Sequence, residues 1–546
     1  MADRFSAGDF MKSYCAPRPP VAKPNSVAIA VGLALAGSLP VAHAASPMPD
    51  PALGGAFLVN TGTVGRQDSS AMAMDAAGDF VVVWEDDGGR DGDGSGIFMQ
   101  RYRADGTLLG HEVLVNTQTS GHQFLPAVAM DASGDFVVAW TDGSGADGDN
   151  NGVFMRRYRA DGVPLGNDVL VNQAQTAGAQ GVPAVAMDAA GDFVVAWKAA
   201  GIADNDVFMR RYRADGAPLG GPMLVNTTHT AGPQILPKIA MDAAGDFVIV
   251  WADVSGADGD GAGVFAQRYS ADGTPLEGEV LVNAAQTAGG QARPVVGMDA
   301  GGDFVVAWTD ISGADGDSYG IFMQRYRADG TPLGGEVLVN KSQTIGNQQI
   351  PAIAMDAVGD FAIAWEDTSG ADGDGYGVFM QRYTADGAPL GDEIQVNTTQ
   401  TAGNQAQPAA AMDAAGDFAV AWADYSGADG SGYGVFAQRY MREISLDLKA
   451  TLAVAPADVV KPGGGLILTG SISNTEPEST LTGNATIDAE LNVTRGLTAT
   501  LKFPGNVGFN YATGTNWTCP AMPANDGTLV CTYDTSLNPA SETTPL

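Results

Sequence analysis

Short apolar segments separated by Asp- and Gly-rich turns recur along most of this chain. One unit of the pattern runs Pro126-Ala-Val-Ala-Met-Asp-Ala-Ser-Gly-Asp-Phe-Val-Val-Ala-Trp140. It predicts a strand at 127–130 (strand A), a hairpin turn at Asp-Ala-Ser-Gly, and a strand at 136–140 (strand B). Because strand B is apolar at every position, we expect it to be buried on both faces.

The same unit continues with two further predicted strands. Residues 153–159 (strand C) combine Phe, Met and Tyr with Arg, which favours a more exposed strand. Ala160-Asp-Gly162 predicts a second hairpin turn, because Asp-Gly tolerates positive φ, and 169–171 predict a short strand D. No segment after the amino-terminal region has a helical period, so the unit is predicted to be all-β.

Tryptophan closes strand B in seven units, which follow one another at spacings of 54–57 residues. Four-stranded units in this number predict a seven-bladed β-propeller. A row of Ig-type sandwiches fails on length, because each such domain needs roughly 100 residues. An open β-solenoid is the remaining alternative. The tryptophans are Trp84, Trp140, Trp197, Trp251, Trp308, Trp365 and Trp422.

The two ends of the repeat array distinguish a propeller from a solenoid. The array opens on an isolated D-type strand at 55–60 and ends after a C-type strand at 435–440, with no D strand following. The first strand therefore fits as the missing outer strand of the last blade. Such pairing joins the two ends and leaves no long open edge, whereas a solenoid needs capping repeats.

The repeats loosely resemble WD-repeat and other propellers in size and in their Trp-ending strand. They are most similar to uncharacterised repeats of secreted bacterial proteins, of the form Pro-x-(Val/Ile)-Ala-Met-Asp-x-x-Gly-Asp-Phe-Val-Val-x-Trp. This resemblance covers residues 52–443 and implies export and a propeller, without a defined activity.

The amino terminus has the pattern of a secretory signal peptide. The bases Lys12, Arg18 and Lys23 precede an apolar run at 26–44, which ends in the small-x-small sequence Ala42-His-Ala44. The run is too short to span a membrane, and no later stretch is long and apolar enough to do so. We therefore expect residues 1–44 to be removed and the mature protein to be extracellular, at the cell surface or periplasmic.

Composition narrows the range of partners. The chain carries 63 acidic and 28 basic residues, a formal charge of −35, so a nucleic acid is an unfavourable partner and cations are favourable ones. Three Cys and four His are too few for a repeated zinc or haem site. An extracellular protein or a glycan is the expected partner.

A different module is predicted at 444–546, where the repeat stops and Thr, Leu and Asn become common. Val460-Lys-Pro-Gly-Gly464, Ser473-Asn474, Trp517-Thr-Cys519 and Val530-Cys531 resemble the Ig-like β-sandwich called domain of unknown function eleven, which occurs in bacterial surface proteins. The final strand of that family is shortened here, so the sandwich is expected to be truncated. In an exported protein Cys519 and Cys531 are expected to form a disulfide; two reduced, buried thiols are the alternative.

The loop between strands B and C holds Asp at positions +2, +7 and +9 after the Trp in five of the seven units; the third unit has Ala199 at +2 and a shorter loop, and the seventh has Ser431 at +9. Residues i and i+2 of an extended loop project to the same side, and several carboxylate oxygens at that spacing suit calcium. No complete calcium signature is present, so a solvated hairpin loop is the alternative. The candidate ligands are Asp142, Asp147, Asp149, Asp253, Asp258, Asp260, Asp310, Asp315, Asp317, Asp367, Asp372 and Asp374.

A glutamine recurs before each strand A, three residues ahead of a proline in most units. Because the D–A connection runs from the rim inward, seven amides could line the channel mouth and bind a polar ligand; satisfying backbone groups of their own turn is the alternative. These residues are Gln67, Gln123, Gln180, Gln234, Gln291, Gln348 and Gln405.

Asp135, Trp140 and Arg157 also recur in every unit, as Asp79, Trp84 and Arg101 in the first. A ring of ligand-binding Arg is one interpretation. We favour a structural pair between the Arg and the Gly-Asp-Phe carboxylate, with Trp filling the space between blades.

No catalytic signature is present. The chain lacks a Gly-x-Ser-x-Gly elbow and the sialidase Ser-x-Asp-x-Gly-x-Thr-Trp box, and its His residues occupy unrelated repeat positions. Acid pairs are abundant, but their near-identity across blades argues against an active site, which normally breaks the symmetry. The sequence therefore favours a non-enzymatic binding or adhesion scaffold, with calcium as a candidate stabilising ion. The alternatives are a propeller enzyme acting on polysaccharide, as lyase or glycosidase, and a passive structural spacer.

Overall fold

The computed structural model describes residues 52–200 and 205–442 with their side chains, and elsewhere only the backbone of short strands. The chain separates into two compact units, one containing Ala52–Arg442 and the other Glu443–Leu546. All described elements are strands. None of the described residues forms a helix with the length and apolar character needed to cross a membrane.

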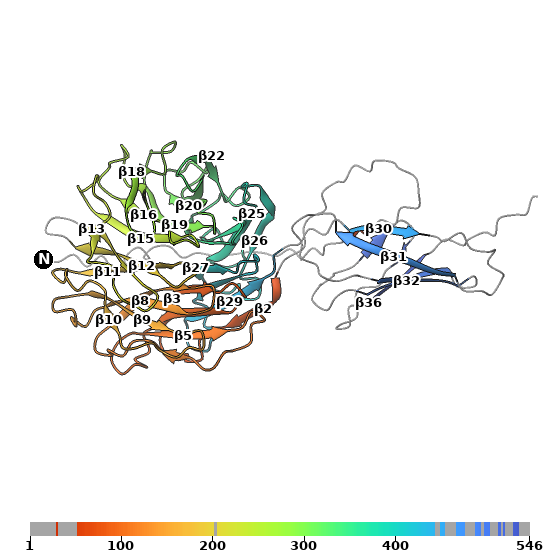
Figure 1. Ribbon diagram of the computed structural model, residues 1–546, viewed down its shortest axis with the longest axis horizontal. Coiled ribbons are helices and arrows are strands. Elements are labelled where there is room, and N and C mark those ends of the chain that lie inside the picture. The colour runs from red at the N-terminus through yellow and green to blue at the C-terminus, as the bar shows by residue number, and fades with distance from the viewer. Residues whose placement is uncertain are drawn as a thin grey trace, which may run out of the picture. The chain divides into compact units, whose positions relative to one another are not determined.

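The first unit is a seven-bladed β-propeller, built from seven sheets of four antiparallel strands (Figure 1). In the second blade, strands A to D are β7 (Gln123–Met130), β8 (Phe136–Asp142), β9 (Gly152–Tyr158) and β10 (Val169–Leu170). The A strands of neighbouring blades contact one another around the whole ring, so they form the wall of the central channel.

The other blades repeat this order. The first blade contains β3 (Gln67–Met74), β4 (Phe80–Asp86), β5 (Gly96–Tyr102) and β6 (Val113–Leu114), and the third contains β11 (Gln180–Met187), β12 (Phe193–Ala200), β13 (Asn205–Tyr212) and β14 (Met223–Leu224). The fourth blade contains β15 (Gln234–Met241), β16 (Phe247–Asp253), β17 (Gly263–Tyr269) and β18 (Pro275–Leu281), and the fifth contains β19 (Gln291–Met298), β20 (Phe304–Asp310), β21 (Gly320–Tyr326) and β22 (Pro332–Leu338). The sixth blade contains β23 (Gln348–Met355), β24 (Phe361–Asp367), β25 (Gly377–Tyr383) and β26 (Pro389–Gln395), and the seventh contains β27 (Gln405–Met412), β28 (Phe418–Asp424) and β29 (Gly434–Tyr440).

The seventh blade is completed by the first strand of the propeller. Strand β2 (Ala52–Leu58) pairs antiparallel with β29, with Leu58 opposite Phe436, and the two strands lie side by side in Figure 1. The backbone N–H of Val435 also donates to the side-chain oxygen of Asn60 at 2.8 Å. The predicted closure of the ring is confirmed, and a solenoid is excluded.

Strand A differs from the prediction, because it begins at Gln123 rather than at 127. A bulge between Phe124 and Ala127 places Leu125 at a φ of 52° and accommodates Pro126 inside the strand. Because proline is uncommon inside a strand, the sequence pattern places the start of strand A after Pro126. The equivalent residue has positive φ in every blade: Ser69, Leu125, Val182, Leu236, Arg293, Ile350 and Gln407.

Burial of the other strands follows the prediction in part. Strand β8 is buried at every position, as expected of an apolar strand with blades on both sides. Strand β9 is also mostly buried, so the prediction of an exposed strand C is wrong. Strand D shields strand C from solvent, and the Phe and Met of strand C pack into the interface with the neighbouring blade. Both predicted hairpin turns are present, with Gly134 and Gly162 at φ values of 92° and 81°.

The core consists of apolar clusters between adjacent blades. Trp140, which is 0 % exposed, packs with Phe154 and Tyr158 of its own blade against Val83 and Met99 of the first. All seven repeated tryptophans are 0 % exposed. Their predicted role in filling the space between blades is confirmed.

The second unit contains one sheet in the order β1-β34-β35-β36-β33-β32-β31-β30. The predicted signal peptide, Ig-like fold and Cys519–Cys531 disulfide depend largely on residues outside the described ones, and they stay predictions. The strands are β1 (Ile29–Ala30), β30 (Leu448–Ala453), β31 (Leu466–Asn474), β32 (Thr486–Asn492), β33 (Gly496–Lys502), β34 (Ala512–Gly514), β35 (Trp517–Thr518) and β36 (Thr528–Tyr533).

Candidate functional site

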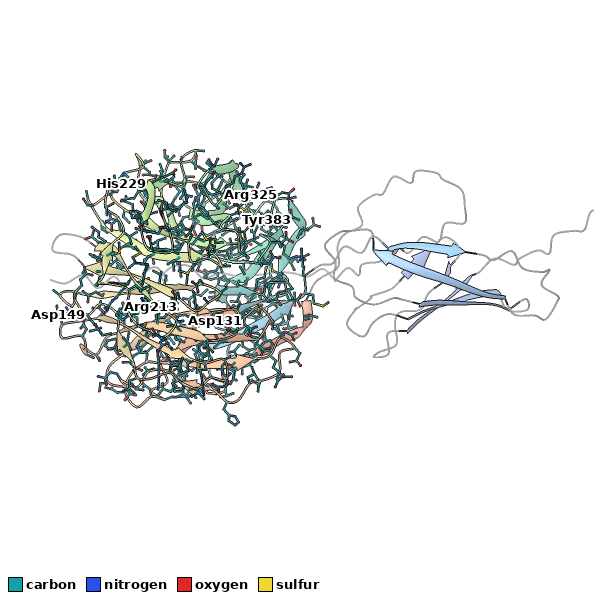
Figure 2. The ribbon with its side chains drawn as sticks, in the orientation of Figure 1. Asp131, Asp149, Arg213, His229, Arg325 and Tyr383 are labelled. Atoms are coloured by element: carbon teal, nitrogen blue, oxygen red, sulfur yellow. The ribbon has the colours of Figure 1, made fainter. Side chains whose placement is uncertain are left out.

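The predicted site residues lie on one face of the propeller. Gln123 at the start of strand A is opposite Asp142 at the end of strand B, and Asp142 is opposite Gly152 at the start of strand C. The D–A and B–C loops therefore share this face, which we call the loop face; the A–B and C–D turns form the opposite, turn face. In Figure 2, Asp149 and His229 of the loop face lie to the left, and Arg325 and Tyr383 lie to the right.

The seven glutamines are buried rather than exposed at the channel mouth. Each is 0–1 % exposed. The amide of Gln123 donates to the Ser120 carbonyl at 3.1 Å and to Asp142 Oδ2 at 3.2 Å, and its oxygen accepts a hydrogen bond from Asn116 at 3.0 Å. This geometry favours the structural interpretation over ligand binding, because no polar group of the amide is left to meet a ligand.

These glutamines are part of a hydrogen-bonded chain that joins each blade to the next. Asn116 ends strand D of the first blade, and its side-chain oxygen accepts from the N–H of Ile97 at 2.7 Å. Its amide reaches Gln123 of the second blade. The same Asn–Gln bond occurs at all seven junctions, at 2.7–3.3 Å, including Asn60–Gln67 at the ring closure.

The predicted calcium ligands take part in the same chain. Asp142 is 1 % exposed, and its Oδ1 accepts from the N–H of Ser144 at 2.9 Å. Asp147 accepts from the N–H of Asp149 and from the Asn172 amide, and Asp149 accepts from the N–H of Gly178 at 2.7 Å. Each carboxylate therefore has protein donors, as the hairpin-loop interpretation expects.

Calcium binding by these loops stays a prediction. Within 52–200 and 205–442, no three His, Cys, Asp or Glu side chains are grouped as a metal site would require. The loops of the fourth, fifth and sixth blades repeat the bonds of the second, for example from Gln291 and from Gln348 to the Asp at +2. This arrangement uses the carboxylates to fix the loops.

The repeated Arg has a structural role, but its predicted partner is wrong. Arg325 donates to the carbonyl of Ala385 in the Ala-Asp-Gly turn of the next blade at 2.9 Å. The Gly-Asp-Phe carboxylate instead accepts from the N–H of the same kind of turn, as Asp360 does from Ala385 at 2.9 Å. Arg and Asp from neighbouring blades thus hold one turn from two sides, rather than pairing with each other.

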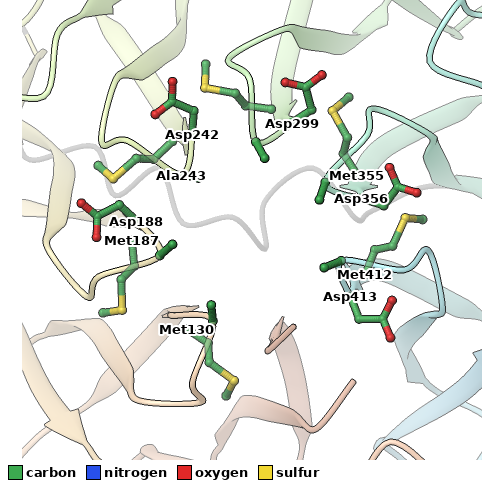
Figure 3. Close-up of a pocket in the computed structure, with 17 residues that line it drawn as sticks. Met130, Met187, Asp188, Asp242, Ala243, Asp299, Met355, Asp356, Met412 and Asp413 are labelled. Carbon is green, nitrogen blue, oxygen red and sulfur yellow. The ribbon is translucent and has the colours of Figure 1, made fainter. Parts of the chain in front are cut away.

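The turn face opens on a ring of Met, Asp and Ala from the ends of the A strands, with a cavity volume of about 170 Å³ (Figure 3). The labelled Asp and Met side chains point away from the centre of the opening. Asp413 explains this orientation, because its Oδ1 accepts from the N–H groups of Ala415 and Asp417 in its own turn. Burial raises the pKa of Asp413. These carboxylates stabilise turns and are poorly placed to meet a ligand.

The inner wall near the loop face departs from the repeat. At the position after each Trp, four blades carry small Ala or Thr and the third carries Lys198, but the first and sixth blades carry Glu85 and Glu366. Opposite Glu85 on strand β3 is Asp68, where the second blade has Phe124. At these two positions of the wall, carboxylates therefore occur only in the first and sixth blades.

Asp68 and Glu85 form the centre of this acidic sector. They are 5 % and 8 % exposed. Arg66 lies beside both, with Nε 3.2 Å from Asp68 Oδ2 and Nη2 3.8 Å from Glu85 Oε1. Burial, aided by the charge of Asp68, raises the pKa of Glu85 to about 7. Burial also raises the pKa of Asp68, while Arg66 opposes the change. Glu85 is thus poised to be protonated near neutral pH.

The sector continues through the seventh and sixth blades. The N–H of Ser69 donates to the Gln407 side chain at 3.1 Å, and the N–H of Gln407 donates to Glu366 Oε2 at 3.3 Å. The Gln349 amide donates to Glu366 Oε1 at 2.7 Å. Burial raises the pKa of Glu366.

Two tyrosines from one loop of the seventh blade border the acidic sector. Tyr433 is 42 % exposed, and its ring centroid is 4.9 Å from that of Tyr425. Burial raises the pKa of Tyr425, and the negative charges of Asp68 and Glu366 add to the effect. An exposed aromatic face therefore adjoins the carboxylates.

The sequence patterns did not single out these residues. A repeat pattern reveals what recurs in every unit, whereas the acidic sector consists of departures from the repeat. The signal was present in the first unit, which has Asp68-Ser-Ser70 where the second has Phe124-Leu-Pro126.

No known family matches the chain by sequence, and no curated protein does. Similar solved structures include a protein of unknown function from Dyadobacter fermentans (11 % identity, 71 % of this chain and 98 % of that chain, TM-score 0.42). The polysaccharide lyase Uly1 has 11 % identity, 69 % and 90 % coverage and a TM-score of 0.42. An α-L-arabinofuranosidase from Fusarium graminearum has 10 % identity, 71 % and 98 % coverage and a TM-score of 0.40.

Proposed function

We propose that the protein is a carbohydrate-active enzyme that cleaves glycosidic bonds at the acidic sector of its channel mouth. The observation that carries this proposal is the Asp68–Glu85 pair, in which burial raises the pKa of Glu85 to about 7 beside a second carboxylate. Carboxyl groups with shifted pKa values at the mouth of a channel are candidates for a general acid and a general base. This proposal adopts the alternative that the sequence left open, in place of a non-enzymatic scaffold.

The chemistry follows from the different environments of the two acids. Glu85, protonated near neutral pH, would donate its proton to the glycosidic oxygen as the bond to the anomeric carbon breaks. Asp68, beside the Arg66 guanidinium, would act as the second carboxylate and stabilise or attack the positively charged anomeric carbon. Water then completes hydrolysis, and its proton returns to the acid–base pair. Tyr433 offers a face on which a sugar ring can stack.

The test is release of new reducing ends from a panel of neutral and acidic polysaccharides. Glu85→Gln and Asp68→Asn should each lower kcat by roughly 10²–10⁴ fold, the usual contribution of a positioned acid or base. Glu277→Gln is the matched control, because Glu277 is exposed on strand D, with a side chain 72 % accessible. For Glu85→Gln, aryl glycosides whose leaving group needs no proton should restore much of the rate. Cleavage that survives both acid substitutions would overturn the proposal.

A second candidate is a glycan-binding or protein-binding surface protein without catalysis. It is favoured by the near-identical Asn–Gln–Asp chain at the blade junctions, which makes most of the loop face alike from blade to blade. Binding of a glycan that is unaffected by Glu85→Gln, together with no cleavage of any polysaccharide, would favour this function. Both candidates place the protein outside the cytoplasm, as the amino-terminal pattern predicts.

A further inference from the structure

Three basic side chains lie on the inner wall in consecutive blades, away from Asp68 and Glu85. Lys198 follows Trp197 on strand β12 of the third blade, Lys238 is on the innermost strand β15 of the fourth, and Arg293 is on strand β19 of the fifth. We call these residues the basic sector. The chain has 63 acidic and only 28 basic residues, so basic side chains in three consecutive blades of one wall are an unusual concentration of positive charge.

Lys198 replaces a hydrogen-bond acceptor. In the second blade the hydroxyl of Thr141 accepts from the N–H of Val182 at 3.0 Å, and Thr309 accepts from Ile350 at 3.2 Å in the same way. At the junction between the third and fourth blades these positions hold Lys198 and Leu236. An ammonium group can only donate, so Lys198 cannot accept from the N–H of Leu236 as the two threonine hydroxyls do at their junctions.

Lys238 adds a second ammonium group close to this junction. It comes two residues after Leu236 and is exposed within the channel. The protein atoms around the channel desolvate both ammonium groups and lower the pKa of Lys198 and the pKa of Lys238, and no acidic neighbour acts against this effect at either residue. In the part of the chain that the structure describes, neither lysine forms an ion pair.

Arg293 adds further hydrogen-bond donors in the fifth blade, next to the sixth blade, which carries Glu366 of the acidic sector. It occupies the positive-φ bulge of strand β19, with a φ of 54°, and is half-buried. Glu366 of the next blade is the acid that acts on its charge most strongly, but the two do not approach within ion-pair distance. The wall therefore changes from basic to acidic between the fifth and sixth blades.

We propose that the basic sector binds the carboxylate or sulfate group of an acidic glycan, so that the substrate of this enzyme is a polyanionic polysaccharide. The proposal rests on the proposed function for the acidic sector, and it names the substrate class of that site. Unpaired, partly desolvated cations bind an anion strongly because little water has to be displaced from them. The net charge of −35 repels polyanions elsewhere, so binding depends on these three residues.

The test compares binding of oligogalacturonate, a sulfated oligosaccharide and a neutral arabino-oligosaccharide, measured by calorimetry. The double variant Lys198→Gln, Lys238→Gln should lose at least tenfold in affinity for an anionic probe and keep its affinity for the neutral one. Lys341→Gln, in an exposed D–A loop, is the matched control and should change affinity by less than twofold. A preference for oligogalacturonate or for the sulfated probe identifies which anionic group is recognised.

The outcomes separate this inference from the function on which it rests. Cleavage of neutral but not acidic polysaccharides, with an unchanged rate in the double lysine variant, would overturn the inference and leave the proposed enzymatic function in place. Tight binding of an acidic glycan that depends on the two lysines, without cleavage, would support the basic sector and overturn the enzymatic proposal. Equal affinity of wild type and double variant for both anionic probes would overturn the inference directly. Thermal melting of each variant confirms that it is folded.

Discussion

Asp68 and Glu85 lie opposite each other on neighbouring strands of the first blade, and one guanidinium, that of Arg66, lies within 4 Å of both carboxylates. One guanidinium cannot neutralise two buried carboxylates, so ionising both of them together is unfavourable. Burial raises the pKa of both. The protonation of this pair should therefore be visible in the stability of the protein.

The contribution of Glu85 to stability should fall as pH rises from about 4.5 to about 7, because Glu85 then ionises in the unfolded chain but resists ionisation in the folded one. The raised pKa means that the contribution of Glu85 is complete below its unfolded value and lost as pH passes its folded value. A shift to about 7 corresponds to about 3 kcal/mol. Glu85→Gln should therefore gain about 3 kcal/mol relative to wild type at pH 8 compared with pH 4.

Denaturant unfolding at the two pH values measures this difference. Glu277→Gln serves as the control, since its exposed carboxyl should alter the pH dependence little. A Glu85→Gln variant whose stability relative to wild type is the same at both pH values would show that Glu85 ionises normally.

The Asn–Gln chain should matter for stability and not for ligand binding. In Gln348→Ala, the amide of Asn340 and Oδ2 of Asp367 lose partners at 2.9 and 3.0 Å inside the protein. Buried polar groups left unpaired cost about 1–3 kcal/mol each, so the free energy of unfolding should fall by about 2–4 kcal/mol. Loss of glycan binding at unchanged stability would instead support the original prediction of a ligand-binding Gln ring.

The repeated Arg should stabilise the contact between blades. Arg325→Ala removes a charged donor to the Ala385 carbonyl at 2.9 Å, and we expect a loss of about 1–2 kcal/mol because the bond is partly exposed to solvent. Arg327→Ala, two residues later and exposed, is the matched control and should change stability by less than about 0.5 kcal/mol. Equal losses in the two variants would show that the inter-blade bond contributes nothing.

Calcium should have little effect on the melting temperature. Asp147 and Asp149 already accept hydrogen bonds from Asn172 and Gly178, so a cation would have to replace these donors. We expect melts in EDTA and in millimolar calcium to coincide. A rise with calcium that is absent in Asp147→Asn, Asp149→Asn would establish the calcium site, since saturation of one site at 100 times its Kd adds about 2.7 kcal/mol.

The architecture was predictable because each blade must satisfy the same packing requirements. Trp140 fills the space between two blades, so its recurrence defines both the number and the spacing of the blades. The unpaired strand before Asn60 and the missing strand after Tyr440 predicted the closure of the ring. The start of strand A was not predictable, because Pro126 lies inside a bulge that hides the period of two.

The site was harder to predict for the opposite reason. A repeated residue is visible in a single sequence, but Asp68 and Lys198 each occur in one blade and Glu85 has a counterpart only in Glu366, so each looks like ordinary variation. Their significance appears when the ring brings the first blade beside the seventh and places all three on one wall. The Gln and Asp residues that recur are the ones that the fold itself requires.

The most direct test of this account is the ionisation of Glu85 in the folded protein. Infrared difference spectra between wild type and Glu85→Gln, recorded from pH 4 to 9, isolate the carboxyl stretch of this one side chain. The account predicts a protonated band that disappears with a midpoint near pH 7. A midpoint near 4.5, the ordinary value for Glu, would contradict the assignment of Glu85 as the acid.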